Sequence, residues 1–200
     1  DGFFEFEKST DTVTLSDGAT LEVDQMLVGA TDVNAFIGLN GGTDAELGFK
    51  VTDADVGLAL MSARQPTGTP LPSDPVDART FTALKVDVQA AEFVGIDGLT
   101  VSLTDLALEL NQGGGTYDAD GTGAGAAAAN TLVVDYSGAG AVTIGAQTLD
   151  FDGADGALLR ASGNVELGFF GFASIDGFFE FEKSTDTVTL SDGATLEVDQ

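Results

Sequence analysis

The chain repeats part of itself without a change. Its first 25 residues, DGFFEFEKSTDTVTLSDGATLEVDQ, return as residues 176–200, which sets a period of 175 residues. Copies kept only for their fold would drift at surface positions such as Lys8 and Lys183, so full identity indicates recent duplication or homogenisation, or a copy added by design. Repetition suits spacing, covering or polymerising better than it suits one catalytic pocket, so we expect a structural protein. Residues 1–175 are then one unit, and 176–200 begin the next.

The boundary between the copies lies inside an apolar stretch. Apolar residues continue past residue 175, from Val165 to Phe172 and from Phe178 to Phe181, with no proline and no long glycine-rich linker. Adjacent units are therefore expected to share a sheet or a core, as a stiff rod does, and not to hang as beads. The phenylalanines near the boundary are expected to pack in the core and between units: Phe3, Phe4, Phe6, Phe169, Phe170 and Phe172.

Apolar and polar residues alternate with period two along most of the chain. Such alternation gives a strand one apolar face, and it predicts an all-β fold. The phase changes at Thr104-Asp105, which indicates a bulge, a corner or a short turn. Together with the apolar boundary, the pattern predicts an elongated repeat architecture, either β-solenoid-like or made of fused β-sandwich units. The clearest runs are Val56, Leu58, Leu60; Leu84, Val86, Val88; Leu99, Val101, Leu103; Leu106, Leu108, Leu110; and Val165, Leu167, Phe169.

Glycine and proline divide the strands. Asp-Gly pairs such as Asp17-Gly18, Asp97-Gly98 and Asp176-Gly177 favour hairpins and corners. All four prolines fall within 64–79, which predicts an extended surface loop. The Gly- and Ala-rich stretch 111–130 has little to pack and predicts an exposed, poorly ordered loop. Two β-rich blocks would then make up each unit.

Charge restricts the possible partners. The terminal copy holds seven of the 33 acidic and one of the seven basic residues, which leaves 26 and six, or about −20, in one period. Such a charge disfavours association with nucleic acid or with an anionic membrane surface. The 43% of hydrophobic residues still provides enough apolar surface for a folded core.

The composition also restricts the chemistry. The chain has no Cys, His or Trp, which excludes disulfides, thiol catalysis, the usual zinc sites and His-dependent nucleophile systems. Carboxylate pairs of the kind that hydrolyse glycosides occur at Glu5/Glu7 and Asp53/Asp55, but they alternate with apolar residues, as a solvated strand face does. We therefore expect no enzyme. No run of 18 apolar residues is present, so no membrane-spanning segment is expected.

Two Asp- and Gly-rich segments are candidate calcium sites. Calcium takes six to eight hard oxygen ligands, which tight Asp-Gly turns can bring together. Neither segment fits the EF-hand or nonapeptide pattern, and turns in an acidic protein are the favoured alternative. The candidate ligands are Asp118 and Asp120 in the first segment, and Asp150, Asp152 and Asp155 in the second.

The long repeat, the Asp-Gly turns, the acidity, the absence of cysteine and the alternating runs resemble the extender regions of giant repetitive bacterial surface proteins, including type I-secreted adhesins. The resemblance implies an extracellular or cell-surface stalk whose partners are neighbouring copies of the repeat, often with calcium in the repeats. Those extenders are often immunoglobulin-like units of about 100 residues, shorter than this period, with clearer calcium motifs.

We therefore expect a structural extracellular repeat that forms a stiff fibre, stalk or surface sheath. One alternative is a calcium-dependent module that binds carbohydrate or a partner through the 111–130 stretch. Another is a self-assembling filament subunit whose units add strands across the boundary.

Overall fold

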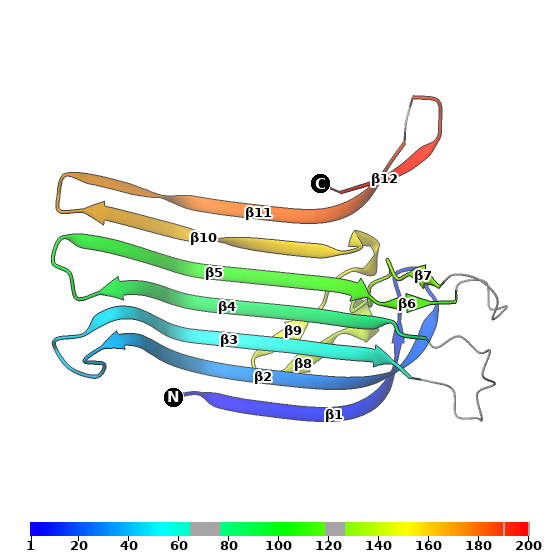
Figure 1. The fold of residues 1–200 in the computed structure, drawn as a ribbon, viewed down its shortest axis with the longest axis horizontal. Helices are drawn as coiled ribbons and strands as arrows, with labels where there is room; N and C mark the ends of the chain where they lie inside the picture. Colours follow the sequence, from blue (N-terminus) through cyan, green and yellow to red (C-terminus); the bar gives the residue numbers. More distant parts are fainter. Residues whose placement is uncertain (65–76, 119–126, 190, 200) are drawn as a thin grey trace.

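A computed structural model describes residues 1–64, 77–118, 127–189 and 191–199. Most of the described residues form one long antiparallel sheet, in which each long strand pairs with the long strand that precedes it in the chain (Figure 1). Between β5 and β10 the chain leaves this sheet, and β10 then pairs directly with β5. The prediction of an all-β chain is confirmed. In sheet order the strands are β1 (Phe3–Thr14), β2 (Thr20–Leu39), β3 (Leu47–Ala63), β4 (Thr80–Val94), β5 (Leu99–Gly114), β10 (Leu158–Phe169) and β11 (Ala173–Thr189), with the short β12 (Thr195–Asp199) paired on β11.

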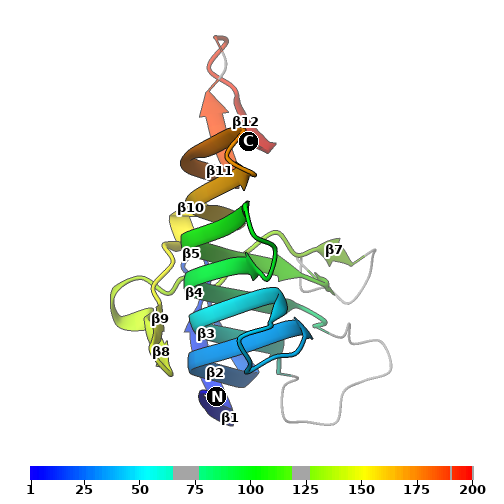
Figure 2. The ribbon, with the colours of Figure 1, turned by 90° about the vertical axis from the view of Figure 1, so that its left-hand side faces the viewer.

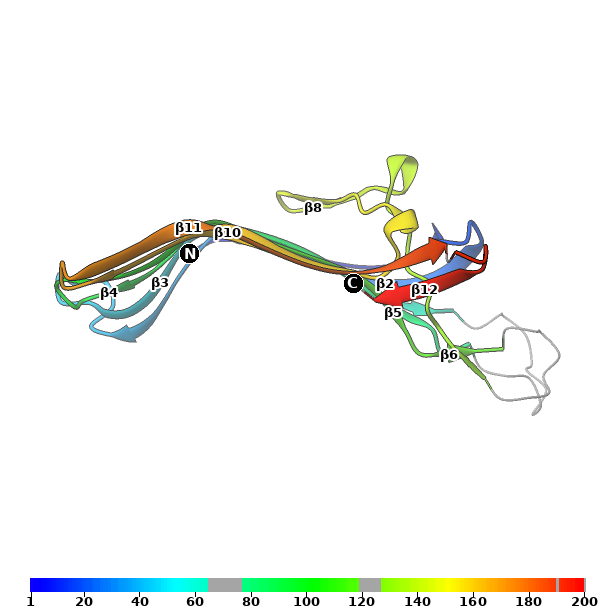
Figure 3. The ribbon, with the colours of Figure 1, turned by 90° about the horizontal axis from the view of Figure 1, so that it is seen from above.

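Short elements lie between β5 and β10. Strands β6 (Thr116–Tyr117) and β7 (Ala128–Ala129) pair with each other, as do β8 (Val142–Ile144) and β9 (Gln147–Leu149). Two 3₁₀ turns, η1 (Gly138–Gly140) and η2 (Gly153–Asp155), flank the β8–β9 hairpin. This connection crosses one face of the sheet and forms a partial second layer there (Figures 2 and 3).

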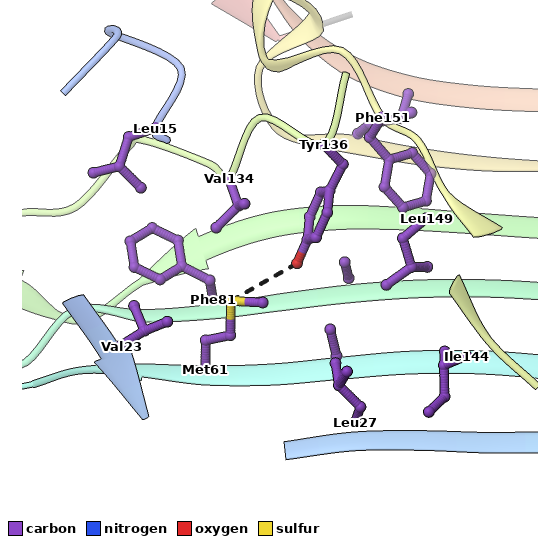
Figure 4. Packing of buried hydrophobic residues seen from close by; sticks show 13 residues of the cluster. Leu15, Val23, Leu27, Met61, Phe81, Val134, Tyr136, Ile144, Leu149 and Phe151 are labelled. Atoms are coloured by element: carbon purple, nitrogen blue, oxygen red, sulfur yellow. Dashed lines mark hydrogen bonds between the residues drawn. The ribbon is translucent and has the colours of Figure 1, made fainter. Parts of the chain in front are cut away.

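The hydrophobic core lies between this second layer and one half of the sheet. Odd-numbered residues of β2 and β3, such as Val23, Leu27 and Met61, face the layer, and Tyr136 packs on them (Figure 4). The Tyr136 hydroxyl donates to Met61 Sδ at 3.9 Å, so its polar end has a partner inside the core. The buried cluster consists of Leu15, Val23, Leu27, Ala59, Met61, Phe81, Ala83, Val134, Tyr136, Ile144, Leu149, Phe151 and Leu158.

Two glycines allow the β8–β9 hairpin to approach the sheet. A Cβ on Gly57 would lie 2.6 Å from Gln147 Cβ, and one on Gly29 would lie 2.9 Å from the Gly145 nitrogen. Real Cβ atoms do not come this close to neighbouring heavy atoms. The absence of side chains at these two positions therefore lets the second layer contact the backbone of β2 and β3.

The sheet bends along a line that crosses its middle (Figure 3). The ladders of the sheet are interrupted at Asp32, Asp53 and Asp105, which have left-handed backbone, with φ of 54°, 56° and 52°, a conformation that aspartate tolerates better than most residues. The predicted irregularity at Thr104-Asp105 is confirmed as a bulge, because the register of β10 with β5 shifts between Ser162 and Asn164.

The phase change in the sequence coincides with this bulge. Leu103 and Leu108 of β5 lie opposite Val165 and Ala161 of β10, and β10 pairs with β11 without a register shift. Val165 and Ala161 are four residues apart on a regular strand and share a face, so the extra residue of β5 places Leu103 and Leu108 on that same face. The phase change therefore keeps the apolar residues of β5 aligned with those of β10.

Strand β11 crosses the boundary between the two copies, since it runs from Ala173 to Thr189. The second copy also repeats the pairing of the first: Thr10 lies opposite Asp24, and Thr185 lies opposite Asp199. Each residue of these pairs is 175 positions from its equivalent. The identical segments thus form the same hairpin in both places.

Several local predictions need correction. The stretch 111–130 is strand and not loop at residues 111–117 and 128–129, apart from Gly115 between β5 and β6, because the β5–β4 ladder continues to Gly114. The Asp176-Gly177 pair is no turn, since it lies within β11. The two expected blocks are one sheet, because β3 pairs with β4 across the proline-rich 64–79 stretch. Within that stretch, 65–76 lie outside the described residues.

The phenylalanines near the boundary are not core residues of this chain. Phe3, Phe4, Phe6, Phe169, Phe170 and Phe172 are all exposed, Phe172 to 93%. They lie on β1 and at the end of the sheet that the second layer does not reach. The density of apolar residues near the boundary therefore marks uncovered surface within the chain.

Candidate assembly interface

The joint between the two copies is an uninterrupted antiparallel ladder. All twelve residues of β10 face residues 173–184 of β11 in one register, from Leu158 opposite Ser184 to Phe169 opposite Ala173. On its other side β10 pairs with β5 of the first copy. The strand that begins the second copy is therefore held by the same kind of backbone hydrogen bonds that hold the strands within the first.

A row of charged side chains crosses this joint. Lys85 lies 3.0 Å from Asp150 and 3.7 Å from Glu109, and Arg160 lies 3.0 Å from Glu109 and 2.9 Å from Glu182. The residues Lys85, Glu109, Arg160 and Glu182 are direct cross-strand neighbours on β4, β5, β10 and β11. Since Glu182 is the copy of Glu7, the row links the side chains of one copy to those of the next.

The pKa values of the two basic groups reflect this row. The hydrogen bond to Glu182 and the nearby carboxylates raise the pKa of Arg160, although partial burial opposes them. For Lys85, partial burial lowers the pKa, but the hydrogen bond to Asp150 and the charges of Asp150, Glu109 and Asp87 outweigh it and raise the pKa. Both groups stay protonated, and each bridges two carboxylates.

The predicted calcium ligands have separate roles. Asp150 pairs with Lys85, Asp152 caps η2 by accepting from the Ala154 nitrogen at 2.9 Å, and Asp155 is exposed in the same turn. Asp118 follows β6 and is partly buried, and Asp120 lies outside the described residues. No three Asp or Glu side chains in the described ranges are arranged to hold a metal ion.

A different aspartate fixes the position of the second layer. Asp135 Oδ1 accepts from the backbone nitrogens of Ser137 at 2.9 Å and Gly153 at 3.1 Å, which ties the start of the layer to η2. Hydrogen bonds from the Ser137 side chain and from these two nitrogens lower the pKa of Asp135. No spacing in the sequence distinguishes Asp135 from the other acidic residues, so sequence reasoning missed it.

An acidic groove of about 280 Å³ contains Asp53 and Asp55, the carboxylate pair noted in the sequence, together with two aspartates that the sequence did not place beside them, Asp87 and Asp105. Asp53 lies in it, and its pKa is raised because its side chain hydrogen-bonds to Asp32, with smaller contributions from burial and from the charges of Asp32 and Asp55. The groove therefore concentrates negative charge where the ladders are interrupted. Its lining consists of Asp53, Asp55, Asp87, Val88, Gln89, Asp105 and Leu106.

No protein-family model, no curated protein and no solved structure matches this chain. Among the described residues, no helix has the length and apolar character needed to cross a membrane. The geometry of the chain itself therefore carries the functional interpretation.

Proposed function

We propose that the chain is a non-enzymatic structural repeat of an extracellular fibre, stalk or surface sheath, in which each unit adds strands to one continuous sheet. The observation that carries this proposal is the double pairing of β11. The copy of β1 pairs with β10 of the preceding unit on one side and with β12, the copy of β2, on the other. A longer array built by the same pairing has no break between units.

The pairing fixes the geometry of such an array. One period contributes six strands to the sheet as described, β1–β5 and β10. Because neighbouring strands lie about 4.8 Å apart, each unit would lengthen the sheet by about 29 Å. A compact globule of the same length would be roughly 40 Å across by the usual scaling of radius with chain length.

The long axis of the array would also be tilted. Following one cross-strand row from Phe4 through Val56 and Leu108 leads to Phe181, which is the copy of Phe6. Each unit is therefore displaced by two residues along the strands, or about 7 Å at the usual rise per residue. The displacement tilts the long axis of the array relative to the normal of the strands.

The test compares chains of increasing unit number by small-angle X-ray scattering. Continuous pairing predicts that the maximum dimension grows by about 29 Å, slightly more along the tilted axis, for each added unit. Growth of roughly 40 Å per unit, with the flexibility of a linked chain, would instead identify separate domains and refute the continuous sheet.

A disulfide tests the joint itself in the 200-residue chain, which has no cysteine of its own. Ala161 and Phe181 lie directly opposite each other, so an Ala161→Cys, Phe181→Cys pair should oxidise within one chain. The matched control pairs Ala161→Cys with Glu182→Cys, whose side chains point to opposite faces and should remain reduced. Equal oxidation of both pairs would show that the register is not fixed.

The outer edge of β1 supports the related proposal of a filament that assembles without covalent linkage. It carries, as residues 1–9, the same residues that β11 presents to β10 as residues 176–184. In a single unit that lacks the second copy, the outer edge of β10 would be free to add to β1 of another unit in the same register. Electron microscopy of fibres grown at high salt from one unit, residues 1–175, tests this alternative.

A further inference from the structure

The face of the sheet opposite the β8–β9 hairpin carries two complete apolar rows. We call them the open apolar face. Their members come from seven neighbouring strands, and the only charged one is Lys183. The first row is Phe4, Ala30, Val56, Val86, Leu108, Ala161 and Phe181, and the second is Phe6, Val28, Leu58, Leu84, Leu110, Leu159 and Lys183.

These side chains remain at least partly accessible, except for Ala30, which is buried. Phe4 and Phe6 are exposed to 69% and 66%, and Leu58, Leu84 and Leu110 in the middle strands are partly exposed. The β8–β9 layer lies over the other side of the sheet (Figure 3). Beyond the second row the surface becomes mixed, because a groove there is lined by apolar Phe6, Met26, Leu60 and Met61 and by polar Lys8, Asp24, Gln25 and Ser62. A contiguous apolar surface of this size on a soluble chain marks an interaction surface.

Acidic residues are absent from both rows, although the chain has 33 of them. The adjacent row on the opposite face reads Glu5, Gly29, Gly57, Lys85, Glu109, Arg160, Glu182, so the charged side chains nearest to the two apolar rows point to the other side of the sheet. A copy of a chain with net charge −26 can approach another copy most closely where neither presents a carboxylate. The open apolar face meets this condition.

The area is also sufficient. Seven strands at about 4.8 Å span about 34 Å, and the two rows with their flanking residues cover about 20 Å along the strands, which gives roughly 700 Å² per copy. Two copies would bury roughly 1,400 Å², within the range of specific protein interfaces. Sheets that pack face to face lie about 10 Å apart, a separation that interdigitated Leu, Val and Phe side chains fill.

We propose that the open apolar face binds the same face of a second copy of this chain, so that two single sheets form one sandwich. For one pair of chains this inference is independent of the proposed array. In an array, which rests on the proposed function, every added unit contributes another such face, and two parallel stalks would join along their length. Their charged faces would point outward on both sides.

The first test is sedimentation equilibrium of the 200-residue chain at high salt, where the Debye length falls to about 3 Å and charge repulsion is screened. We expect a reversible dimer. Leu84→Glu, in the central strand of the face, should weaken dimerisation at least about a hundredfold, because two carboxylates would then be buried without partners. Ile37→Glu is the matched control. Ile37 is exposed to 78% in the other half of the sheet, and the dimer should persist.

A second measurement keeps the test decisive if Leu84→Glu fails to fold. A single thiol at Leu84→Cys should form a covalent dimer with a short bis-maleimide, whereas Ile37→Cys should not. A chain that is monomeric at millimolar concentration and high salt overturns the proposal. An unreactive Leu84→Cys in that monomer would show that the chain covers its own face. Neither outcome affects the Ala161–Phe181 disulfide, which tests the joint between repeat copies separately.

Discussion

Replacing Arg160 by Met should weaken the joint between repeat copies by a small and measurable amount. The arginine donates to Glu182 Oε2 at 2.9 Å and to Glu109 Oε2 at 3.0 Å. Its side chain is 37% exposed and that of Glu182 is 41% exposed, so water screens the pair, and each such ion pair contributes about 0.2–1 kcal/mol. Glu109 keeps Lys85 at 3.7 Å after the change, which limits the loss on that side.

We therefore expect Arg160→Met to lower the free energy of unfolding by about 1 kcal/mol, of which about 0.5 kcal/mol is coupling to Glu182. For a chain of this size that corresponds to about 2–4 °C in Tm. The assay is a double-mutant cycle of Arg160→Met and Glu182→Gln, measured by urea unfolding at low and at high salt. The coupling should shrink as salt increases, because exposed charges are screened.

Glu180 provides the control for this cycle. It lies on the same strand but opposite Ser162, one pair away from Arg160 on the same face. Glu180→Gln should show no coupling to Arg160→Met beyond experimental error. Equal coupling to Glu180 and Glu182, or no coupling to Glu182 at low salt, would refute the assignment of Arg160 as the side-chain link between copies.

Three further predictions concern the fold and the metal. Gly57→Ala should lower the free energy of unfolding in urea by about 1–3 kcal/mol, because the new Cβ would meet Gln147. The control Gly177→Ala should be neutral, since no heavy atom lies near that position. Equal effects of the two substitutions would contradict the close packing of the hairpin. Burial raises the pKa of Tyr136 above its ordinary value of 10. Above pH 10 the unfolded chain can ionise this tyrosine and the folded chain cannot, so the free energy of unfolding should fall by about 1.4 kcal/mol per pH unit. Tyr136→Phe should remove this pH dependence, as measured by unfolding curves on either side of pH 10. Calcium should raise Tm no more than magnesium does at equal ionic strength, because Asp150 and Asp152 already have partners within the chain. A rise in Tm that is specific to calcium and reversed by a chelator would instead assign the Asp-Gly turns to a metal site.

Alternation predicted the strands well because it records a local property of the backbone. In β4 and β5 every strand residue that the pattern indicated lies in the sheet, and the phase change at Thr104-Asp105 marks the bulge. Alternation gives no information on what covers each face. The sequence therefore could not show that Phe81 and Ala83 are buried while Leu84 and Val86 stay partly exposed.

The side chains that matter at the joint were not predictable for a similar reason. Arg160 and Glu109 are 51 residues apart, and only the register of β10 with β5 brings them together. Asn111 was assigned to a loop because glycines follow it, yet its side chain is buried and donates to the Val134 carbonyl at 2.9 Å. Contacts set by register require the order of strands, which local patterns do not contain.

The even number of sheet strands in one period explains how this unit can repeat without a linker. Successive strands of an antiparallel sheet reverse direction, so an odd number per period would deliver the next copy pointing backwards and require a crossover. With six strands per period in the described sheet, β11 runs in the same direction as β1, and the short turn after Phe169 suffices to connect the copies. The identical segment then meets β10 on one side and its own hairpin partner on the other. Each unit is displaced by two residues along the strands relative to the one before, so that Phe181, the copy of Phe6, lies in the cross-strand row that begins at Phe4. Because this number is even, the displacement leaves the alternation of faces and the hydrogen-bonding pattern unchanged, and the pairing can recur in every unit.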